Sequence, residues 1–345
     1  MCGQNIRLSK LGYFCILSFS CLLFFYFRGF SISQLIIIQN NDSVSLRRLL
    51  LASIQAAKLG GIKVKNIRME QSLQVKTKGH TKEGANDLVT LGDMLSHKAM
   101  YFGLKREFPD LHIVSEEVSE SDKTYQEDSS LLNLSALEEM NLHLGNYDTL
   151  VPNEDITVWI DPLDATQEYT ENLTEFVTTM VCVAVKGKAI IGVIHLPFKD
   201  QTVWAWNGHS SNIHYSLKTE NINSHMKVIV SRSHSGKVKE IAKIAFGKDT
   251  EIITAGGAGY KSLLVAQREV DAYVHITAIK KWDICAGNAI IKQLGGDMTD
   301  LKGNEINFLD KTRTDLALND GLVATFQNHR EVVAKLKDFN LNKTS

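Results

Sequence analysis

Apolar runs separated by short turns mark the middle of the chain. The turns read Lys-Gly-Lys and Pro-Phe-Lys-Asp, and the runs that they join occupy residues 178–185, 189–195 and 202–206. Runs of this length between tight turns predict an antiparallel meander. A further apolar run, residues 157–160, predicts a strand that ends in the segment DPLDATQEY.

The last third of the chain has a different pattern, in which apolar runs alternate with segments of helical periodicity. We expect strands at 228–231, 252–254, 272–276 and 322–326, and helices at 235–246, 260–268, 284–294 and 329–339. This alternation predicts an α/β half with a largely buried sheet. Joined to the antiparallel half, it predicts an α/β protein built as a layered sandwich of helices and sheets.

The region before the meander is less regular. Apolar positions at helical spacing predict helices at 46–57 and 87–108, and a short apolar run predicts a strand at 111–115. The lysine-rich segment 76–82 predicts a loop. The acidic region 116–154 has no strong period and predicts an insertion.

The first thirty residues form a separate hydrophobic segment. Residues 11–27 carry no charge and would span roughly 25 Å as a helix, and the apolar residues that follow extend this towards the ~30 Å of a bilayer core. A cleaved signal peptide is the alternative, but its apolar region is usually about 7–15 residues long and ends in a small-residue cleavage site, which is missing here. We therefore expect a signal anchor. Because Arg7 and Lys10 precede it, the positive-inside rule predicts a single-pass type II protein with its bulk in a lumen. The expected organisation is a cytosolic tail (1–10), a transmembrane anchor (11–30), a lumenal stem (31–45) and one domain (46–345) with halves 46–226 and 227–345.

Composition excludes two classes of protein. Hydrophobic residues make up 44% of the chain and charged residues 22%, which is ordinary for a globular protein and argues against disorder. The formal net charge of -1 gives no global attraction to a nucleic-acid polymer.

A lumenal position bears on two kinds of residue. N-x-[ST] sequons are acceptors for glycans, and they occur at Asn41, Asn133, Asn172 and Asn342. Cys182 and Cys285 lie in apolar surroundings, which favours buried free thiols. A disulfide between them is the alternative, since a lumen permits it.

Two aspartates follow the predicted strand at 157–160. In Asp161-Pro162-Leu163-Asp164 the proline cannot continue strand pairing, so we expect a turn. The turn would bring both carboxylates and the Leu163 carbonyl to one point, and an oxygen-only set suits Mg²⁺. The alternative is an ordinary Asp-Pro surface turn.

Further acidic residues lie at the ends of predicted elements. Glu116 and Glu117 follow the strand at 111–115, and Asp283 precedes the helix at 284–294. The alternatives are a solvated acidic loop for the glutamates and a helix N-cap for Asp283. Together with the aspartate pair, these carboxylates could form a two-metal cluster, since without cations they would repel one another.

The three acidic motifs together resemble the inositol monophosphatase / fructose-bisphosphatase superfamily. The resemblance rests on SEE at 115–117, DPLDAT at 161–166 and WDICAG at 282–287, and it covers roughly residues 46–339. Ser115 and Ala165 depart from the pattern, because the superfamily usually has glycine at both positions. The resemblance implies an αβαβα fold, a lithium-sensitive phosphatase that uses two or more Mg²⁺ ions, and a family that often forms homodimers.

Longer segments are similar to the Golgi-type branch of this superfamily. The similarity is carried by VWIDPLDATQEYT, VSRSHSG, AGGAGYK and IKKWDICAGNAI. It implies a 3′(2′),5′-bisphosphate nucleotidase of the Golgi membrane that hydrolyses adenosine 3′,5′-bisphosphate, the by-product of sulfotransferases, to AMP and phosphate in the lumen. The alternatives are a phosphatase of the same fold acting on an inositol phosphate or another small sugar phosphate, and a membrane-anchored binding protein without activity.

The resemblance also implies roles for individual residues. Asp93 and Thr166 would be catalytic and would orient and deprotonate a water molecule, although Asp93 by itself is typical of an exposed helix carboxylate. The metal ligands would be Glu116, Asp161, the Leu163 carbonyl, Asp164 and Asp283. Two strand-to-helix loops, whose N–H groups and glycines suit an anion, would supply the nucleotide contacts Ser231, His234, Gly257 and Lys261.

Overall fold

The computed structural model describes residues 42–80, 86–117, 132, 147–213, 225–232 and 237–337. The expected tail and anchor, most of the stem, His234 and the sequons Asn41, Asn133 and Asn342 lie outside these residues. The chain divides into two compact units, Met1–Ser43 and Val44–Ser345. Within the described ranges, no helix has the length and the hydrophobicity that crossing a bilayer requires.

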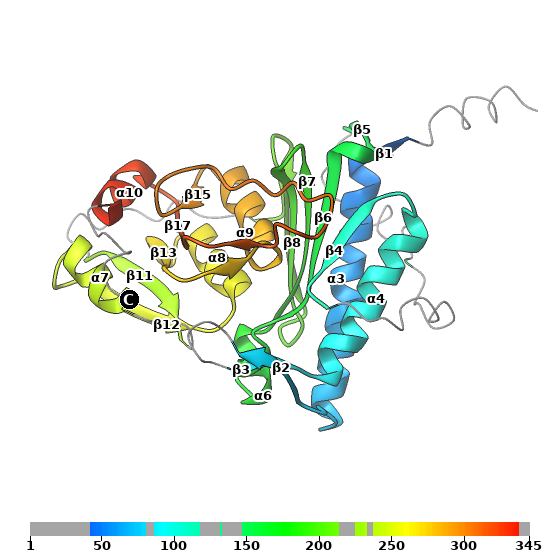
Figure 1. Ribbon diagram of the computed structural model, residues 1–345, viewed down its shortest axis with the longest axis horizontal. Coiled ribbons are helices and arrows are strands. Elements are labelled where there is room, and N and C mark those ends of the chain that lie inside the picture. The colour runs from blue at the N-terminus through cyan, green and yellow to red at the C-terminus, as the bar shows by residue number, and fades with distance from the viewer. Residues whose placement is uncertain are drawn as a thin grey trace, which may run out of the picture. The chain divides into compact units, whose positions relative to one another are not determined.

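In the larger unit, layers of helices alternate with layers of sheet in the order helix, sheet, helix, sheet, helix (Figure 1). The helix layers are α3 (Leu46–Met69) with α4 (Leu91–Glu107), α8 (Ala258–Ala266) with α9 (Lys281–Gln293), and α7 (Val238–Phe246) with α10 (His329–Lys337). This arrangement confirms the layered αβαβα fold.

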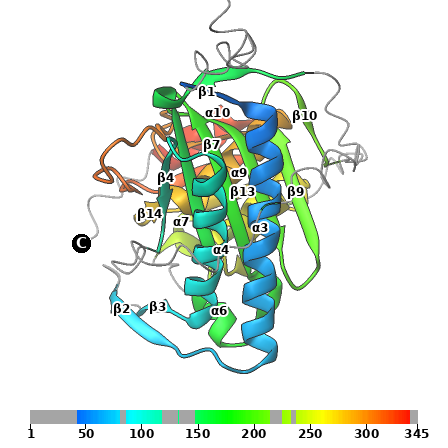
Figure 2. The same ribbon diagram turned by 90° about the vertical axis from the view of Figure 1, so that its right-hand side faces the viewer.

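The first sheet packs against α3 and α4, which lie in front of it in Figure 2. Its strand order is β10-β9-β8-β7-β6-β4. The bounds are β4 (His112–Ser115), β6 (Ile156–Asp164), β7 (Thr178–Val185), β8 (Lys188–Leu196), β9 (Gln201–Trp206) and β10 (Ser210–Ser211). The successive strands β6 to β10 are antiparallel, which confirms the meander. Edge strand β4 runs parallel to β6, so the segments that follow these two strands leave the sheet at the same end.

The second sheet lies between the middle and last helix layers. Its order is β12-β11-β13-β17-β15, with bounds β11 (Lys227–Ser231), β12 (Glu251–Ala255), β13 (Ala272–His275), β15 (Asp297–Asp300) and β17 (Leu322–Thr325). β11 is parallel to β12 and β13, and β17 is antiparallel to β13 and β15. The predicted alternation of strands and helices is therefore confirmed.

Shorter elements surround these layers. β2 (Lys76–His80) pairs with β3 (Asn86–Val89), and β14 (Ile279–Lys280) pairs with β16 (Ala317–Leu318). The others are β1 (Ser43–Ser45), β5 (Leu150–Pro152), the short helix α6 (Thr166–Thr170) and single 3₁₀ turns at Asn153–Asp155 and Thr174–Phe176.

The expectations for the first hundred residues need three corrections. The predicted loop at 76–82 is a strand over its first five residues, β2, whose mainly exposed side chains give no apolar signal. The helix expected from residue 87 begins at Leu91, because Thr90 is its N-cap and its hydroxyl accepts from the Asp93 N–H. The helix expected at 46–57 continues to Met69. The glycines Gly60 and Gly61 lie inside this helix. They allow a close approach to neighbouring side chains, since a Cβ on Gly61 would come within 2.4 Å of His195.

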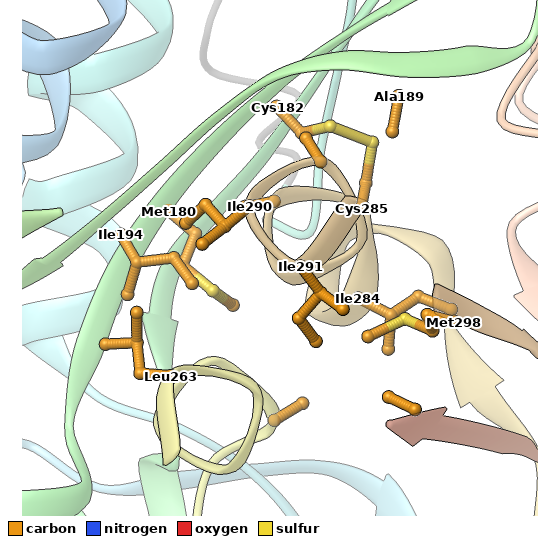
Figure 3. Close-up of a cluster of buried hydrophobic side chains, with 14 of the residues drawn as sticks. Met180, Cys182, Ala189, Ile194, Leu263, Ile284, Cys285, Ile290, Ile291 and Met298 are labelled. Carbon is orange, nitrogen blue, oxygen red and sulfur yellow. A yellow bond between two sulfur atoms is a disulfide. The ribbon is translucent and has the colours of Figure 1, made fainter. Parts of the chain in front are cut away.

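A disulfide joins the first sheet to the middle helix layer. Cys182 of β7 and Cys285 of α9 are bonded, with their Cα atoms 5.6 Å apart, and Met180, Ile194 and Ile290 lie in the same buried cluster (Figure 3). The prediction of free thiols is therefore wrong. The cysteines are 103 residues apart in the sequence, so only the packing of α9 on β7 brings them together.

Candidate active site

The aspartate pair lies on a β-bulge rather than on a turn that ends the strand. Asp161 pairs with Met180 and Asp164 pairs with Thr178, so β6 advances by three residues where β7 advances by two. Pro162 lies inside this irregularity, where its missing N–H removes no ladder hydrogen bond. Strand pairing therefore continues past the proline, contrary to the prediction. Helix α4 holds the bulge in place, since Ser96 Oγ donates to the Pro162 carbonyl at 2.6 Å.

Carboxylates from separate segments meet around Asp161. Its side chain is 1% exposed, and burial raises its pKa well above the ordinary value. The negative charges of Glu116, Asp164, Asp283 and Asp93 raise this pKa further. The acidic residues of all three motifs therefore lie close enough to Asp161 for their charges to affect its pKa.

The chemistry of these donors fits a hard divalent cation. Burial also raises the pKa values of Asp164 and Asp283 above their ordinary range, so the cluster is costly to ionise without positive charge nearby. A cation would relieve this repulsion, and carboxylate and carbonyl oxygens are the ligands that Mg²⁺ prefers. Among the described residues, no group of three or more His, Cys, Asp or Glu side chains is already arranged so that it could hold a metal ion.

The first turn of α8 and the glycine that precedes this helix support Asp164. The Gly259 N–H donates to Asp164 Oδ2 at 2.8 Å. Gly257 has a positive φ of 64°, and a Cβ there would lie 2.7 Å from the Phe176 carbonyl oxygen and 3.0 Å from Asp164 Oδ2. Only glycine fits this position without displacing the carboxylate.

Asp93 and Thr166 form a direct pair. Thr166 Oγ1 lies 3.0 Å from Asp93 Oδ1 and 3.1 Å from the Leu163 carbonyl oxygen, and Asp93 Oδ2 accepts from the Thr90 N–H at 2.7 Å. Asp93 is fully buried. Burial raises its pKa to about 7, with a further contribution from Glu116, although the Thr90 hydrogen bonds oppose this. A carboxyl group with this pKa can accept a proton near neutral pH.

Ala165 precedes Thr166 in the left-handed conformation, with φ 70° and ψ 46°. An L-residue with a Cβ pays about 1–2 kcal/mol there and glycine does not. This left-handed conformation explains why glycine is usual at this position in the superfamily. In this chain Ala165 adopts the same conformation at that energetic cost.

Lys78 is a site residue that the sequence analysis missed. Its Nζ lies 2.9 Å from Glu116 Oε1 and 2.6 Å from Glu117 Oε1. Although burial lowers the pKa of Lys78, the charges of Glu116 and Glu117 raise it well above its ordinary value, so the ammonium stays protonated. Lys78 belongs to β2, the segment predicted as a loop, and nothing in the local sequence indicates that this lysine lies beside the two glutamates.

The substrate residues expected in the two strand-to-helix loops have different surroundings. Ser231 ends β11 and is 7% exposed, while His234 lies outside the described residues. Lys261 is only 3% exposed and donates to the Gly257 carbonyl at 2.5 Å, so its ammonium faces inward. Burial lowers the pKa of Lys261 to about 8, whereas Asp164 counteracts the shift. Arg232, which has no signal of its own in the sequence, is an exposed cation at this place and pairs with Glu171 at 2.6 Å.

A hollow of about 340 Å³ lies apart from these residues, between β15 and α10. Both ring nitrogens of its histidine, His329, are in hydrogen-bonding contact with threonine hydroxyls, Thr299 at 2.9 Å and Thr325 at 3.0 Å. A histidine satisfied in this way packs helix α10 onto the sheet, and we assign the hollow no function.

Comparison with known proteins gives the same family as the motifs. The model of the Inositol monophosphatase family matches residues 45–340. A zebrafish (Danio rerio) protein named Inositol monophosphatase 3 is 46% identical over 99% of this chain and 100% of its own length. A mouse (Mus musculus) protein named Golgi-resident adenosine 3′,5′-bisphosphate 3′-phosphatase is 46% identical over 87% of this chain and 83% of its own length.

A solved structure agrees at the level of the fold. The extragenic suppressor protein suhB from Bartonella henselae superposes with a TM-score of 0.61 at 19% identity, covering 85% of this chain and 98% of that one. Together with the family match and the buried carboxylates, these similarities show that the chain belongs to the inositol monophosphatase family.

Proposed function

We propose that this protein is a Mg²⁺-dependent phosphomonoesterase that hydrolyses adenosine 3′,5′-bisphosphate to AMP and inorganic phosphate. The observation that carries the proposal is the group of carboxylates from the three acidic motifs whose charges act on the buried Asp161. The choice of substrate is supported by relatives that are named as phosphatases of this compound, including one 46% identical.

The residues that would hold Mg²⁺ are Glu116, Asp161, the Leu163 carbonyl, Asp164 and Asp283. When bound there, Mg²⁺ would supply positive charge for the phosphate and lower the pKa of a bound water. The protein's own contribution is to hold these oxygens in place, which the bulge does for Asp161 and the first turn of α8 does for Asp164.

Asp93 and Thr166 provide a route for a proton. The Thr166 hydroxyl is placed to donate to Asp93 Oδ1 and can accept a proton from water in return. Because the pKa of Asp93 is raised to about 7, its carboxyl can take that proton at neutral pH. The reaction balances as phosphate ester and water giving the nucleoside 3′-hydroxyl and inorganic phosphate.

The nucleotide would lie beside the loops that follow β11 and β12. The proposed contacts are Ser231 at the end of β11, Gly257 at the N-cap of α8, and His234. Lys261 faces inward, so we expect no direct contact with the nucleotide. Its positive charge would instead partly neutralise the negative charge of Asp164.

We further propose that the enzyme works in the Golgi lumen, held there by the apolar segment 11–30. The Cys182–Cys285 disulfide supports an oxidising compartment, since disulfides are rare in the cytosol. Relatives that are named Golgi-resident support the particular organelle. Protection of the domain from added protease in intact microsomes would test this location, and digestion without detergent would contradict it.

The experiment that tests the substrate compares phosphate release from adenosine 3′,5′-bisphosphate and from inositol 1-phosphate, with and without Mg²⁺ and with added lithium. We expect a higher kcat/KM for the nucleotide, dependence on Mg²⁺ and inhibition by lithium. The second candidate is inositol phosphate hydrolysis, which the name of the zebrafish relative favours, and a preference for inositol 1-phosphate would select it. If phosphate is released from neither compound, the remaining candidate function is that of a binding protein without activity.

A further inference from the structure

A segment between β15 and β16, residues 307–316, crosses the first sheet at β6 and β4, and we call it the strap. Trp159 Nε1 donates to the Phe308 carbonyl at 2.9 Å, and Thr157 Oγ1 donates to the Asp310 carbonyl at 3.0 Å. Phe308 is 1% exposed and belongs to the core cluster that includes α9. The strap is therefore fixed to β6, the strand that carries Asp161 and Asp164.

Asp310 fixes the strap to β4 as well. Its carboxylate is buried, with Oδ2 3.0 Å from His112 Nε2 and 2.8 Å from the Arg313 N–H. Burial raises the pKa of Asp310, but the hydrogen bonds from His112 and from the Arg313 N–H outweigh it, so the pKa lies below its ordinary value. An ionised carboxylate only accepts, so His112 Nε2 is the donor.

Arg313 reaches the residue next to a proposed metal ligand. Its Nη2 donates to the Ser115 carbonyl at 2.9 Å, and Glu116 follows directly. On the other side of this edge strand, the Glu116 N–H donates to the Ile160 carbonyl of β6 at 3.0 Å. The backbone at Ser115–Glu116 is thus held between β6 and the guanidinium of Arg313.

The strap also touches the start of α9. Asp315 Oδ2 accepts from Lys281 Nζ at 2.5 Å, and the carbonyl of Leu316, the last residue of the strap, accepts from the Lys281 N–H at 2.9 Å. Lys281 is buried and lies two residues before Asp283. One continuous segment therefore contacts the two backbone sites that present Glu116 and Asp283.

We propose that Arg313 is a positioning residue, which sets the Glu116 carboxylate relative to Asp283 by clamping the Ser115 carbonyl to the strap. The inference rests on the metal site proposed above. Glu116 directly follows β4 and Asp283 lies on α9, 167 residues further along the chain, and the strap contacts the backbone beside both of them. An arginine suits this task because its planar guanidinium donates in a fixed direction and remains charged at every relevant pH.

The test is direct Mn²⁺ binding to the full chain, measured by the electron paramagnetic resonance signal of free Mn²⁺, with thermal unfolding as a parallel measurement. Removing a residue that hydrogen-bonds a metal ligand typically costs about 10–100-fold in metal affinity. Arg313 bonds the backbone next to a ligand, so we expect Arg313→Ala to raise the Mn²⁺ Kd by about tenfold, the lower end of that range. Arg313→Lys keeps one donor and should give an intermediate Kd. Lys311→Ala removes an exposed cation of the same strap and should bind Mn²⁺ like the wild type.

Activity supplies a second readout. The Mg²⁺ concentration for half-maximal activity should rise in Arg313→Ala, while kcat at saturating Mg²⁺ stays within about twofold, because the ligands themselves are intact.

The outcomes separate this inference from the proposed function. If wild type and Asp161→Asn bind Mn²⁺ equally weakly, the metal site is wrong and the role of Arg313 is overturned with it. If the wild type binds and Arg313→Ala binds as well as Lys311→Ala, only the positioning role is overturned. Should Arg313→Ala fail to fold, Arg313→Lys decides, and a wild-type Kd in that variant overturns the inference.

Discussion

Removing the disulfide by the double substitution Cys182→Ala and Cys285→Ala should lower the free energy of unfolding by several kcal/mol. The bond closes a loop with a sequence separation of 103 residues, and cross-linking a loop of this length reduces the entropy of the unfolded chain by about 4.7 kcal/mol at 25 °C. Both cysteines are at most 1% exposed, so the alanines also leave small cavities, at a cost of the order of 1 kcal/mol. Measured losses for native disulfides are about 2–5 kcal/mol, which is the range we expect.

Urea unfolding followed by tryptophan fluorescence measures this difference, because Trp159, Trp204, Trp206 and Trp282 are all buried and will report their exposure. The double variant should unfold at a lower urea concentration than the oxidised wild type. Dithiothreitol in the unfolding reaction should move the wild type towards the variant and leave the variant unchanged. A variant with the wild-type midpoint, or a wild type that does not respond to dithiothreitol, would show that the cysteines are free and that the packing of α9 on β7 needs no cross-link.

The remaining predictions concern the candidate site and the buried histidine. Asp161→Asn should abolish phosphate release yet raise the unfolding temperature without metal, because it removes one charge from a repelling buried cluster; continued turnover would contradict the metal mechanism. Thr166→Ala should lower kcat by about 100-fold or more, within the range of proton-transfer groups, and Thr166→Ser should restore most of it; unchanged kcat in the alanine variant would remove Thr166 from the proton route. Millimolar Mg²⁺ should raise the unfolding temperature of the wild type but not that of Asp161→Asn, as measured by differential scanning fluorimetry, and equal shifts would place the ion elsewhere. Burial lowers the pKa of His195 to about 4, below the ordinary value of 6.5, so the folded state binds fewer protons than the unfolded state between these values. Above pH 6.5 the neutral His195 does not reduce the free energy of unfolding. As the pH falls from 6.5 towards 4, this free energy decreases by about 3 kcal/mol in all. His195→Gln should remove this part of the pH dependence in urea unfolding at pH 7 and pH 4.5, and an identical pH dependence in both proteins would refute it.

The sequence predicted the elements whose signals are local. The apolar runs of β7, β8 and β9 are separated by short turns of glycine, proline, lysine and aspartate. Both the strands and their antiparallel order could therefore be inferred without the structure. The strand–helix alternation from β11 to α10 was equally visible. Three acidic motifs at predicted element ends were enough to indicate the family and to suggest which carboxylates belong together.

Other features of the site follow from contacts between distant segments. The pairing of β6 with β7 turns the Pro162 region into a bulge, whereas the proline alone indicated the end of the strand. Lys78 lies beside Glu116 only because an exposed hairpin folds over the end of β4, and the charge pattern of that hairpin is the same as that of a solvated loop.

The amino-acid sequence by itself determined the strands of the meander, the alternation of strands and helices after it, and which carboxylates follow predicted elements, because burial periodicity and turn chemistry act over a few residues. Tertiary structure alone decided the partners of distant residues: the bonding of Cys182 to Cys285 and the clamp of Arg313 on Ser115. These contacts depend on how whole layers pack. No local pattern encodes the distance between two residues that are a hundred or more positions apart, and that distance is set only when the sheets and helices bury their apolar faces together.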